Sequence, residues 1–147
     1  MAKMRIKYGN KGLERALKRF ETGLIDDVRE VIAKTATTIQ STATALAPVD
    51  EGNLKQSIDL TFSKDGLSAV VTVGAEYAIY VEYGTGVYSK DGRGRKTPWV
   101  YWSDKLNQYI VTRGMPAQPF WNPALDAGAR QFAIGMKKTG RMVIYHV

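Results

Sequence analysis

Few residues in this sequence have the type and spacing that enzymatic or metal chemistry requires. Its one histidine, His146, is the residue before the last, where we expect the imidazole to face solvent rather than to act as a general base. The carboxylates show no spacing typical of metal ligands. The sequence has no cysteine, which excludes a thiol nucleophile, a thiolate metal site and a disulfide framework. We therefore predict a protein that is not an enzyme and that uses neither a metal nor a cofactor.

Glu82 is the exception among the carboxylates, because it lies between the apolar and aromatic residues Val81 and Tyr83. Such neighbours favour burial, and we expect a buried glutamate here to pair with a basic partner. Buried carboxylates also occur in active sites, so a small enzyme built on Glu82 is the third and weakest hypothesis for the function.

A glycine-rich segment at residues 84–97 raises the hypothesis of phosphate binding. It contains four glycines and no apolar periodicity, so we predict a flexible loop. Its glycines match neither the dinucleotide-binding spacing nor the Walker pattern, and the required strand, loop and helix context is missing. Four basic residues in this loop are predicted to face a partner or DNA: Lys90, Arg93, Arg95 and Lys96.

Aromatic residues adjoin this basic loop, among them Trp99, Tyr101 and Trp102. A basic loop beside aromatic strands occurs in nucleic-acid-binding proteins, but aromatic residues in strands more often form a core or cross-strand pairs, which is the interpretation that we favour. The sequence has no signature of a recognition helix or an RNA-binding module. Any contact with DNA would therefore involve the phosphate backbone, without sequence specificity and with strong salt dependence.

The net charge of +7 is distributed unevenly. Residues 1–20, 90–97 and 130–147 carry charges of +6, +3 and +4, whereas the rest of the chain carries −6. The basic excess thus lies in a basic N-terminal arm at residues 1–11, in the glycine-rich loop and toward the C-terminal end. This distribution indicates extensions or rims that meet an acidic partner rather than a uniformly basic body.

Length and composition predict one soluble globular domain over residues 1–147. The sequence has 147 residues, of which 44% are hydrophobic and 24% charged. Its apolar runs are only a few residues long, so we expect neither a membrane span nor a signal peptide.

Periodicity predicts a long amphipathic helix over residues 13–46, either unbroken or as two helices in line that meet at Gly23. Pro48 ends it. An unbroken helix of this length is longer than the domain is wide, so we expect one end to project. Between residues 33 and 47 its face consists of alanine and threonine, which we expect to fit under a sheet, or alternatively to form a subunit interface.

Two hairpins and two helical segments complete the expected elements. Residues 50–58 predict a capped helical turn, followed by a hairpin over 60–73 that turns at 64–66. Residues 77–85 fit either a strand or a short helix, and we favour a helix with Gly84 as its left-handed cap. A second hairpin is predicted over 99–112.

The last helix is expected to start between Pro119 and Pro123 and to end before Gly140, with a tail or edge strand at residues 141–147. Together these elements predict an α+β fold. A long N-terminal amphipathic helix and a C-terminal helix would pack on a small antiparallel β-sheet with hairpins.

Three segments, at residues 47–58, 77–85 and 116–125, occur in an order that resembles the minor tail-component family of long-tailed bacteriophages and prophages. The family is also described as tail-completion or head-tail joining proteins. The resemblance covers roughly residues 10–135. The sequence departs from it in Glu51, where threonine is commoner, and in the hairpin at 99–112, which many shorter members lack.

The motif residues are predicted to act in structure rather than in chemistry, by ending helices, capping them and anchoring an aromatic pair. They are Pro48, Asp50, Gly52, Leu54, Ser57, Ile58, Tyr77, Ala78, Glu82, Gly84, Thr85, Pro119, Phe120, Pro123 and Ala124.

The resemblance implies a structural virion protein at the head-proximal end of a phage tail, assembled in the cytoplasm of the bacterial host. It would take part in tail completion and head-tail joining as a subunit of a homo-oligomeric, hexameric ring around the DNA channel. Its partners would be a tail-tube or tail-terminator protein and head connector proteins, without a membrane. The alternative is a non-specific nucleic-acid-binding protein that uses the basic loop and the termini.

Overall fold

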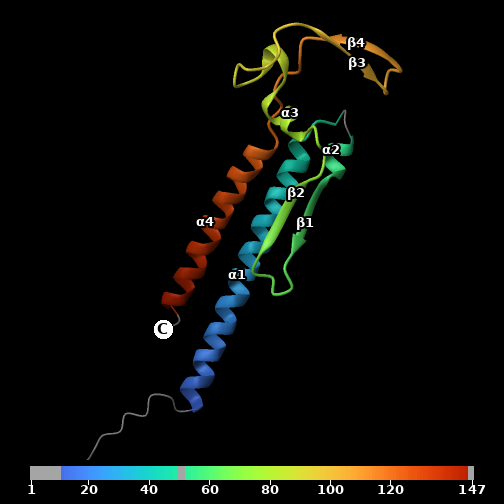
Figure 1. Cartoon of the computed structure of the whole chain (residues 1–147). Coiled ribbons are helices and arrows are strands. Elements are labelled where there is room, and N and C mark those ends of the chain that lie inside the picture. The colour runs from blue at the N-terminus through green and yellow to red at the C-terminus, as the bar shows by residue number, and fades with distance from the viewer. Residues whose placement is uncertain (1–10, 50–51, 146–147) are drawn as a thin grey trace, which may run out of the picture.

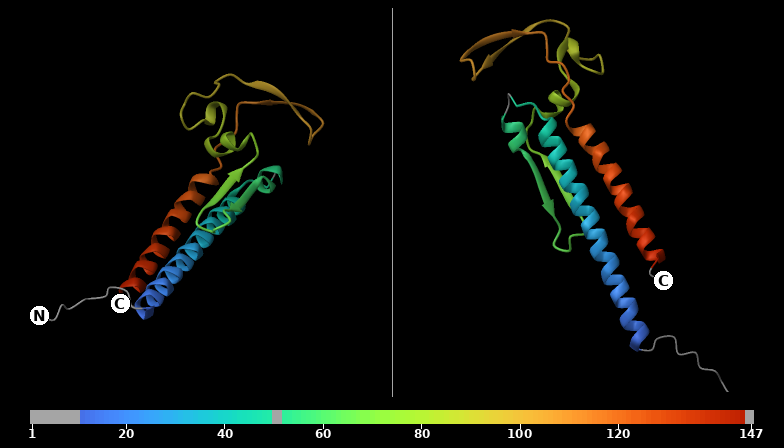
Figure 2. Two further views of the ribbon diagram at one scale, coloured as in Figure 1. Left: turned by 60° about the horizontal axis from the view of Figure 1, so that its bottom comes forward. Right: turned by 180° about the vertical axis from the view of Figure 1, so that it is seen from behind.

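Two long antiparallel helices form the frame of the molecule (Figure 1). The computed structural model describes residues 11–49 and 52–145. Helix α1 (Lys11–Leu46) and helix α4 (Trp121–Tyr145) lie side by side, and the hairpin of β1 (Ile58–Phe62) and β2 (Ala69–Val73) packs against α1. Both views of Figure 2 show the same arrangement from other sides.

Three short elements and a second hairpin lie at one end of this frame, where α1 ends and α4 begins (Figure 1). They are α2 (Gly52–Gln56), α3 (Ala78–Tyr83), a 3-10 turn η1 (Gly86–Tyr88), β3 (Trp99–Ser103) and β4 (Gln108–Thr112). The predicted α+β class and both predicted hairpins are confirmed. The strands form two separate two-stranded sheets rather than one, and α4 packs mainly on α1.

Helix α1 is continuous over 36 residues, so the alternative of two helices that meet at Gly23 is wrong. One interior glycine costs only about 1 kcal/mol relative to alanine, too little to interrupt a long periodic helix. The first turns of α1 extend beyond the rest of the molecule, as the helix length predicted (Figure 1). Leu13, Leu17 and Phe20 are exposed there.

Helix α4 also continues past the expected stop. It passes through Gly140 and ends at Tyr145, so the prediction of an end before Gly140 and of an edge strand is wrong for residues 141–145. The single glycine is again too weak a stop signal. Residues 1–10 of the predicted N-terminal arm lie outside the described residues, as do Asp50, Glu51, His146 and Val147, whereas Lys11, the last residue of that arm, begins α1.

Glycines on α4 allow the two long helices to approach closely. A Cβ atom at Gly128 would lie 2.3 Å from Cγ1 of Ile39, and one at Gly135 would lie 2.8 Å from Cγ1 of Val31, both on α1. The two glycines are seven residues apart and therefore lie on the same face of α4. Glycine at these positions thus sets the separation of the helix pair.

The main core lies at the end of the frame where the short elements gather. Its buried side chains come from α1 and the residue after it, from α2, β1 and α3, and from the start of α4 and the residue before it: Ala43, Ala47, Leu54, Ile58, Val81, Phe120 and Ala124. The alanine face of α1 therefore packs within the chain, against the β1–β2 hairpin among other elements, as the favoured interpretation predicted. Leu54 and Phe120 are the largest fully buried side chains.

Substituting alanine for glycine should have opposite effects at Gly23 and Gly128. Gly23→Ala should raise the free energy of unfolding by about 0.5–1 kcal/mol, because its Cβ enters open space and the unfolded chain loses freedom. Gly128→Ala should lower it by about 1–3 kcal/mol through the clash with Ile39. Urea denaturation of both variants measures the difference, and equal stabilisation would contradict the close packing of α1 and α4.

Candidate interaction site around helix α3

Helix α3 has one buried and one exposed side. Its residues Val81 and Glu82 are buried, whereas Ile79, Tyr80 and Tyr83 are exposed. The prediction of a helix rather than a strand at residues 77–85 is confirmed, and its buried side explains why the segment folds here. Its exposed side presents two aromatic rings and a branched apolar side chain to solvent.

Glu82 holds the start of helix α4. Its Oε2 atom accepts hydrogen bonds from the backbone N–H groups of Phe120 at 2.8 Å and Trp121 at 2.9 Å, and its Oε1 atom accepts one from Asn122 at 3.1 Å. The next residue is Pro123, which has no N–H to donate. One carboxylate therefore satisfies the free N–H groups at the start of α4 and lies at the positive end of the helix dipole.

The expectation of a basic partner for Glu82 is wrong, although its burial is confirmed at 4% exposure. The partner is the N-terminus of α4, contributed by residues 38 to 40 positions further along the chain. Sequence reasoning missed this link because it treated residues 77–85 and 116–125 as separate motifs. The proline in the first turn of α4 was the available signal, since it marks a helix start.

Gly84 ends α3, but not as the left-handed cap that we predicted. Its φ is 77° and its ψ is 170°, which lies outside the left-handed helical region. A Cβ atom there would come within 2.8 Å of the carbonyl oxygen of Tyr88 and 2.9 Å of the backbone nitrogen of Ala117. Glycine is therefore required by its positive φ and by close backbone packing, and the chain turns sharply into the next loop.

The beginning of the glycine-rich loop is fixed to the segment that follows β4. Thr85 donates its N–H to Met115 O at 2.9 Å and accepts the N–H of Met115 on Oγ1, while Val87 donates to Arg113 O at 3.0 Å. A Cβ atom at Gly86 or Gly114 would lie 2.0 or 2.1 Å from a backbone oxygen of the opposite segment. Here glycines bring backbones together and do not cradle a phosphate, while the predicted flexibility of the loop stays a prediction.

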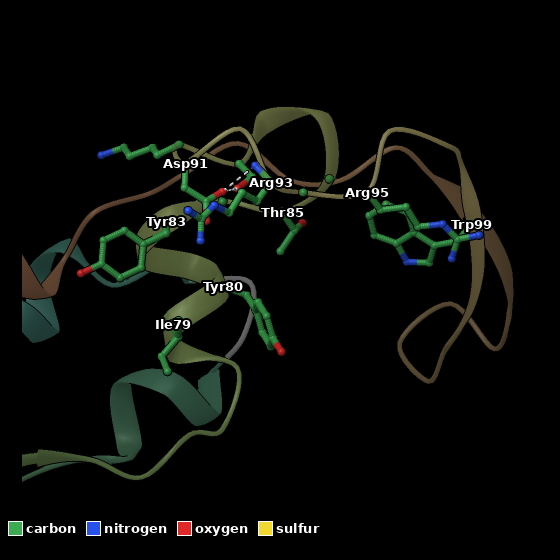
Figure 3. A pocket seen from close by; sticks show the side chains of 13 residues that line it. Ile79, Tyr80, Tyr83, Thr85, Asp91, Arg93, Arg95 and Trp99 are labelled. Carbon is green, nitrogen blue, oxygen red and sulfur yellow. Dashed lines mark hydrogen bonds between the residues drawn. The ribbon is translucent and has the colours of Figure 1, made fainter.

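A hollow of about 940 Å³ lies between α3, this loop and the start of β3 (Figure 3). The exposed side of α3 forms one part of its lining, and Trp99 lies at the other end. Three of the four predicted partner-facing cations line it: Lys90, Arg93 and Arg95. Lys96 is exposed but is not among the lining residues.

One cation in this hollow, Arg95, lies beside an aromatic ring. The guanidinium of Arg95 lies 5.7 Å from the ring centre of Trp99, and its Nε donates to Thr97 Oγ1 at 3.0 Å. Asp91, the carboxylate in the lining, accepts hydrogen bonds from Ser89 Oγ and from the N–H of Arg93. The hollow therefore combines an apolar and aromatic lining with a basic rim.

The β3–β4 hairpin carries an apolar face that the rest of the described chain leaves exposed. Val100 and Trp102 on β3 lie opposite Val111 and Tyr109 on β4, with exposures of 58%, 47%, 69% and 73%. The rings of Trp102 and Tyr109 meet edge to face at 5.0 Å between their centres. The predicted cross-strand pairing is confirmed, but these aromatics are exposed and do not form a core.

The remaining motif residues act in packing and turns. Leu54 and Ile58 lie in the core, Ser57 Oγ donates to Leu54 O at 2.8 Å, and α2 begins at Gly52. The predicted capping residue Asp50 lies outside the described residues. Four further motif residues are partly buried: Pro48, Tyr77, Ala78 and Pro119.

Two turns with the same sequence, Ser-Lys-Asp-Gly, occur at residues 63–66 and 89–92. In each, the serine hydroxyl and a later backbone N–H donate to the aspartate, and the glycine has a φ of 71°. These hydrogen bonds, first of all the serine bond, hold the pKa of Asp65 and of Asp91 below the usual value of an aspartate. The second turn borders the hollow and presents Lys90 to it.

Removing the serine should raise the pKa of the aspartate in the same turn. An aspartate whose pKa is lowered in the folded state stabilises the fold at pH values above its ordinary pKa. This stabilisation is lost as the pH falls through the lowered pKa. We expect Ser89→Ala to raise the pKa of Asp91 and to leave Asp65 unchanged, and Ser63→Ala to do the reverse. Carboxyl NMR titration measures both, and an unchanged Asp91 pKa in Ser89→Ala would refute the assignment.

Removing the carboxylate of Glu82 should destabilise the protein strongly. Glu82→Ala leaves three N–H groups without their acceptor, and we expect a loss of about 3 kcal/mol in the free energy of unfolding. Glu82→Gln should lose less stability than Glu82→Ala, because one side-chain oxygen remains as an acceptor. It should still lose some, because its NH2 group faces a backbone N–H. The matched control is exposed Glu76→Ala, which should change little. Losses below 0.5 kcal/mol by urea denaturation, roughly the size of an ordinary surface substitution, in both Glu82 variants would contradict the capping role.

Two kinds of site find no support among the described residues. Within residues 11–49 and 52–145, no group of three or more histidine, cysteine, aspartate or glutamate side chains is placed to hold a metal ion. None of the helices described is long and apolar enough to cross a membrane.

Comparison with known proteins identifies the family. Residues 11–84 match the family described as "Bacteriophage HK97-gp10, putative tail-component", and the match spans half of the chain. It covers α1 to α3 and ends at Gly84, so the third motif and the β3–β4 hairpin lie outside it. No curated protein and no solved structure matches the chain. In agreement with the resemblance in its motifs, the chain belongs to the HK97-gp10-like family of bacteriophage tail components.

Proposed function

We propose that this protein acts at the head-proximal end of the phage tail, in tail completion and head-tail joining. It would do so as a subunit of a ring around the DNA channel, with six copies to match a six-fold tail. Membership of a tail-component family places it in the virion among other virion proteins. The position within the tail, the ring and the number of copies are the proposal.

The observation that carries the proposal is the amount of apolar surface that one copy leaves exposed. Much of it lies in three places: the first turns of α1, the exposed side of α3 and one face of the β3–β4 hairpin. Further exposed apolar side chains lie on the β1–β2 hairpin and on α4. Soluble monomers rarely expose contiguous apolar patches larger than a few hundred Å², whereas assembly subunits bury such patches against neighbours. Surfaces in several places support contact with more than one neighbour, as a subunit between tail and head requires.

The partners would be a tail-tube or tail-terminator protein on one side and head connector proteins on the other. We also propose that the protein is not an enzyme and uses no cofactor. Glu82, the carboxylate with the strongest claim to chemistry, already accepts three backbone hydrogen bonds and has a structural role.

Non-specific binding of DNA is the second candidate function. Lys90, Arg93 and Arg95 gather at one hollow and supply three of the positive charges that such binding needs. The lining between them is mostly apolar, with Ile79 and Tyr80 exposed in it, which suits protein side chains better than phosphates. A salt titration of DNA affinity separates the two: a DNA-binding protein loses affinity steeply with salt, and an assembly subunit shows no tight binding as a monomer.

Virions made without this protein test the proposal directly. Electron microscopy should show heads and tails that are not joined, or tails whose upper end is incomplete, because the joining surface is missing. Supplying the wild-type gene in trans should restore joined particles. Full-length tails on joined heads in the absence of the protein would contradict the proposed position.

A further inference from the structure

Two surfaces of one copy are complementary in chemistry. One is the hollow beside α3, which has an apolar and aromatic lining and a rim of Lys90, Arg93 and Arg95. The other is the outer face of the β3–β4 hairpin, defined by Val100, Trp102, Tyr109 and Val111. Both are exposed, and they lie at the same end of the molecule (Figure 1).

The two surfaces of the same copy face in different directions. Side chains along a strand alternate between the two faces of a sheet. Trp99, the first residue of β3, lines the hollow, so Val100 and Trp102 both lie on the opposite face of β3. Figure 3 shows Trp99 and Arg95 at the end of the hollow from which the hairpin departs. The outer face therefore points away from the hollow to which its own strand is attached.

We propose that the outer hairpin face of one copy docks into the hollow of a second copy. This inference rests on the proposed ring, since it names the surfaces by which neighbouring subunits meet. Because two different surfaces form the contact, each copy keeps one of them free for a further neighbour. Such head-to-tail contacts generate a ring when the rotation between copies closes.

Charge and ring chemistry favour this occupant. The rim cations of the hollow lack a carboxylate partner in the lining other than Asp91, which accepts bonds from Ser89 Oγ and Arg93 N–H. The hairpin offers the rings of Trp102 and Tyr109, and the faces of such rings attract guanidinium and ammonium groups. A carboxylate also lies beside Trp102, because its Nε1 donates a hydrogen bond to Oδ1 of Asp104 at 2.9 Å.

The hairpin tip is neutral overall because Asp104 is followed by Lys105. Attraction would therefore come mainly from apolar burial and from cations over ring faces, not from opposite net charges. Aromatic residues and arginine are also the residue types that dominate the energetics of protein interfaces.

Mixing two defective variants tests a head-to-tail contact. The hairpin variant carries Trp102→Ser and Tyr109→Ser, and the hollow variant carries Tyr80→Ser and Arg93→Glu. We expect the wild-type protein to form closed oligomers as its concentration rises in light scattering after size-exclusion chromatography. Each variant alone should associate about 30-fold more weakly, as expected for central aromatic interface residues.

The mixture of the two variants should form one-to-one dimers and no larger species. One intact hairpin face and one intact hollow remain in each such pair, and the other two surfaces are defective. Val70→Ser, on the exposed side of β2, is the matched control and should assemble like the wild type. Wild-type protein that stays monomeric at every concentration, or variants that assemble normally, would overturn the inference.

Introduced cysteines provide a second test, because the natural chain contains none. The double variant Tyr80→Cys and Tyr109→Cys should form a ladder of disulfide-linked multimers on oxidation. Either single variant should form none, since a head-to-tail contact pairs residue 80 of one copy with residue 109 of the next. A ladder from the double variant supports the contact, and its absence in an oligomeric protein refutes it.

The two proposals can fail separately. A protein that completes tails in the virion but gives neither heterodimers nor a ladder would leave the position in the tail intact and remove the hairpin contact. If the protein forms the heterodimers and the ladder but virions made without it still have joined heads and tails, the hairpin contact stands and the proposed position in the tail is refuted.

Discussion

The carboxylate of Glu82 at the start of α4 is the interaction on which the rest of the structure depends. It connects the short helix α3 to a 25-residue helix that would otherwise begin with unsatisfied N–H groups. Phe120, which donates one of these bonds, and Val81, which precedes Glu82, are both buried in the main core. Hydrogen bonding and apolar burial thus fix α3 at the point where α1, α2, β1 and α4 meet.

With its inner side fixed, α3 presents its other side to solvent and determines where the hollow lies. Ile79, Tyr80 and Tyr83 form one part of the hollow, and the segments 84–94 and 113–115 pack their backbones together beside it. That packing also determines where the β3–β4 hairpin leaves the body of the protein (Figure 1). A structural glutamate therefore positions two surfaces that are suited to binding neighbours.

Apolar periodicity and the residue types at turns were sufficient to predict most of the helices and strands. The spacing of apolar residues in α1, the Lys64-Asp65-Gly66 turn and the alternation in both hairpins depend on local physics. The partner of Glu82 and the close approach of Gly128 to Ile39 depend on residues far apart in sequence, which one sequence does not pair. The exposure of Trp102 and Tyr109 was also missed, because strand aromatics usually indicate a core, whereas no other element of the described chain covers this face of the hairpin.

The central claim is that this family member fits among its virion neighbours through the apolar surfaces that the free chain exposes. A cryo-electron microscopy reconstruction of the assembled tail with its head connector tests it most directly. The account predicts a ring of this protein at the upper end of the tail, with Val100, Trp102, Tyr109 and Val111 of each copy covered by the next copy. A reconstruction in which these side chains remain in solvent, or in which the protein lies elsewhere in the tail, would contradict it.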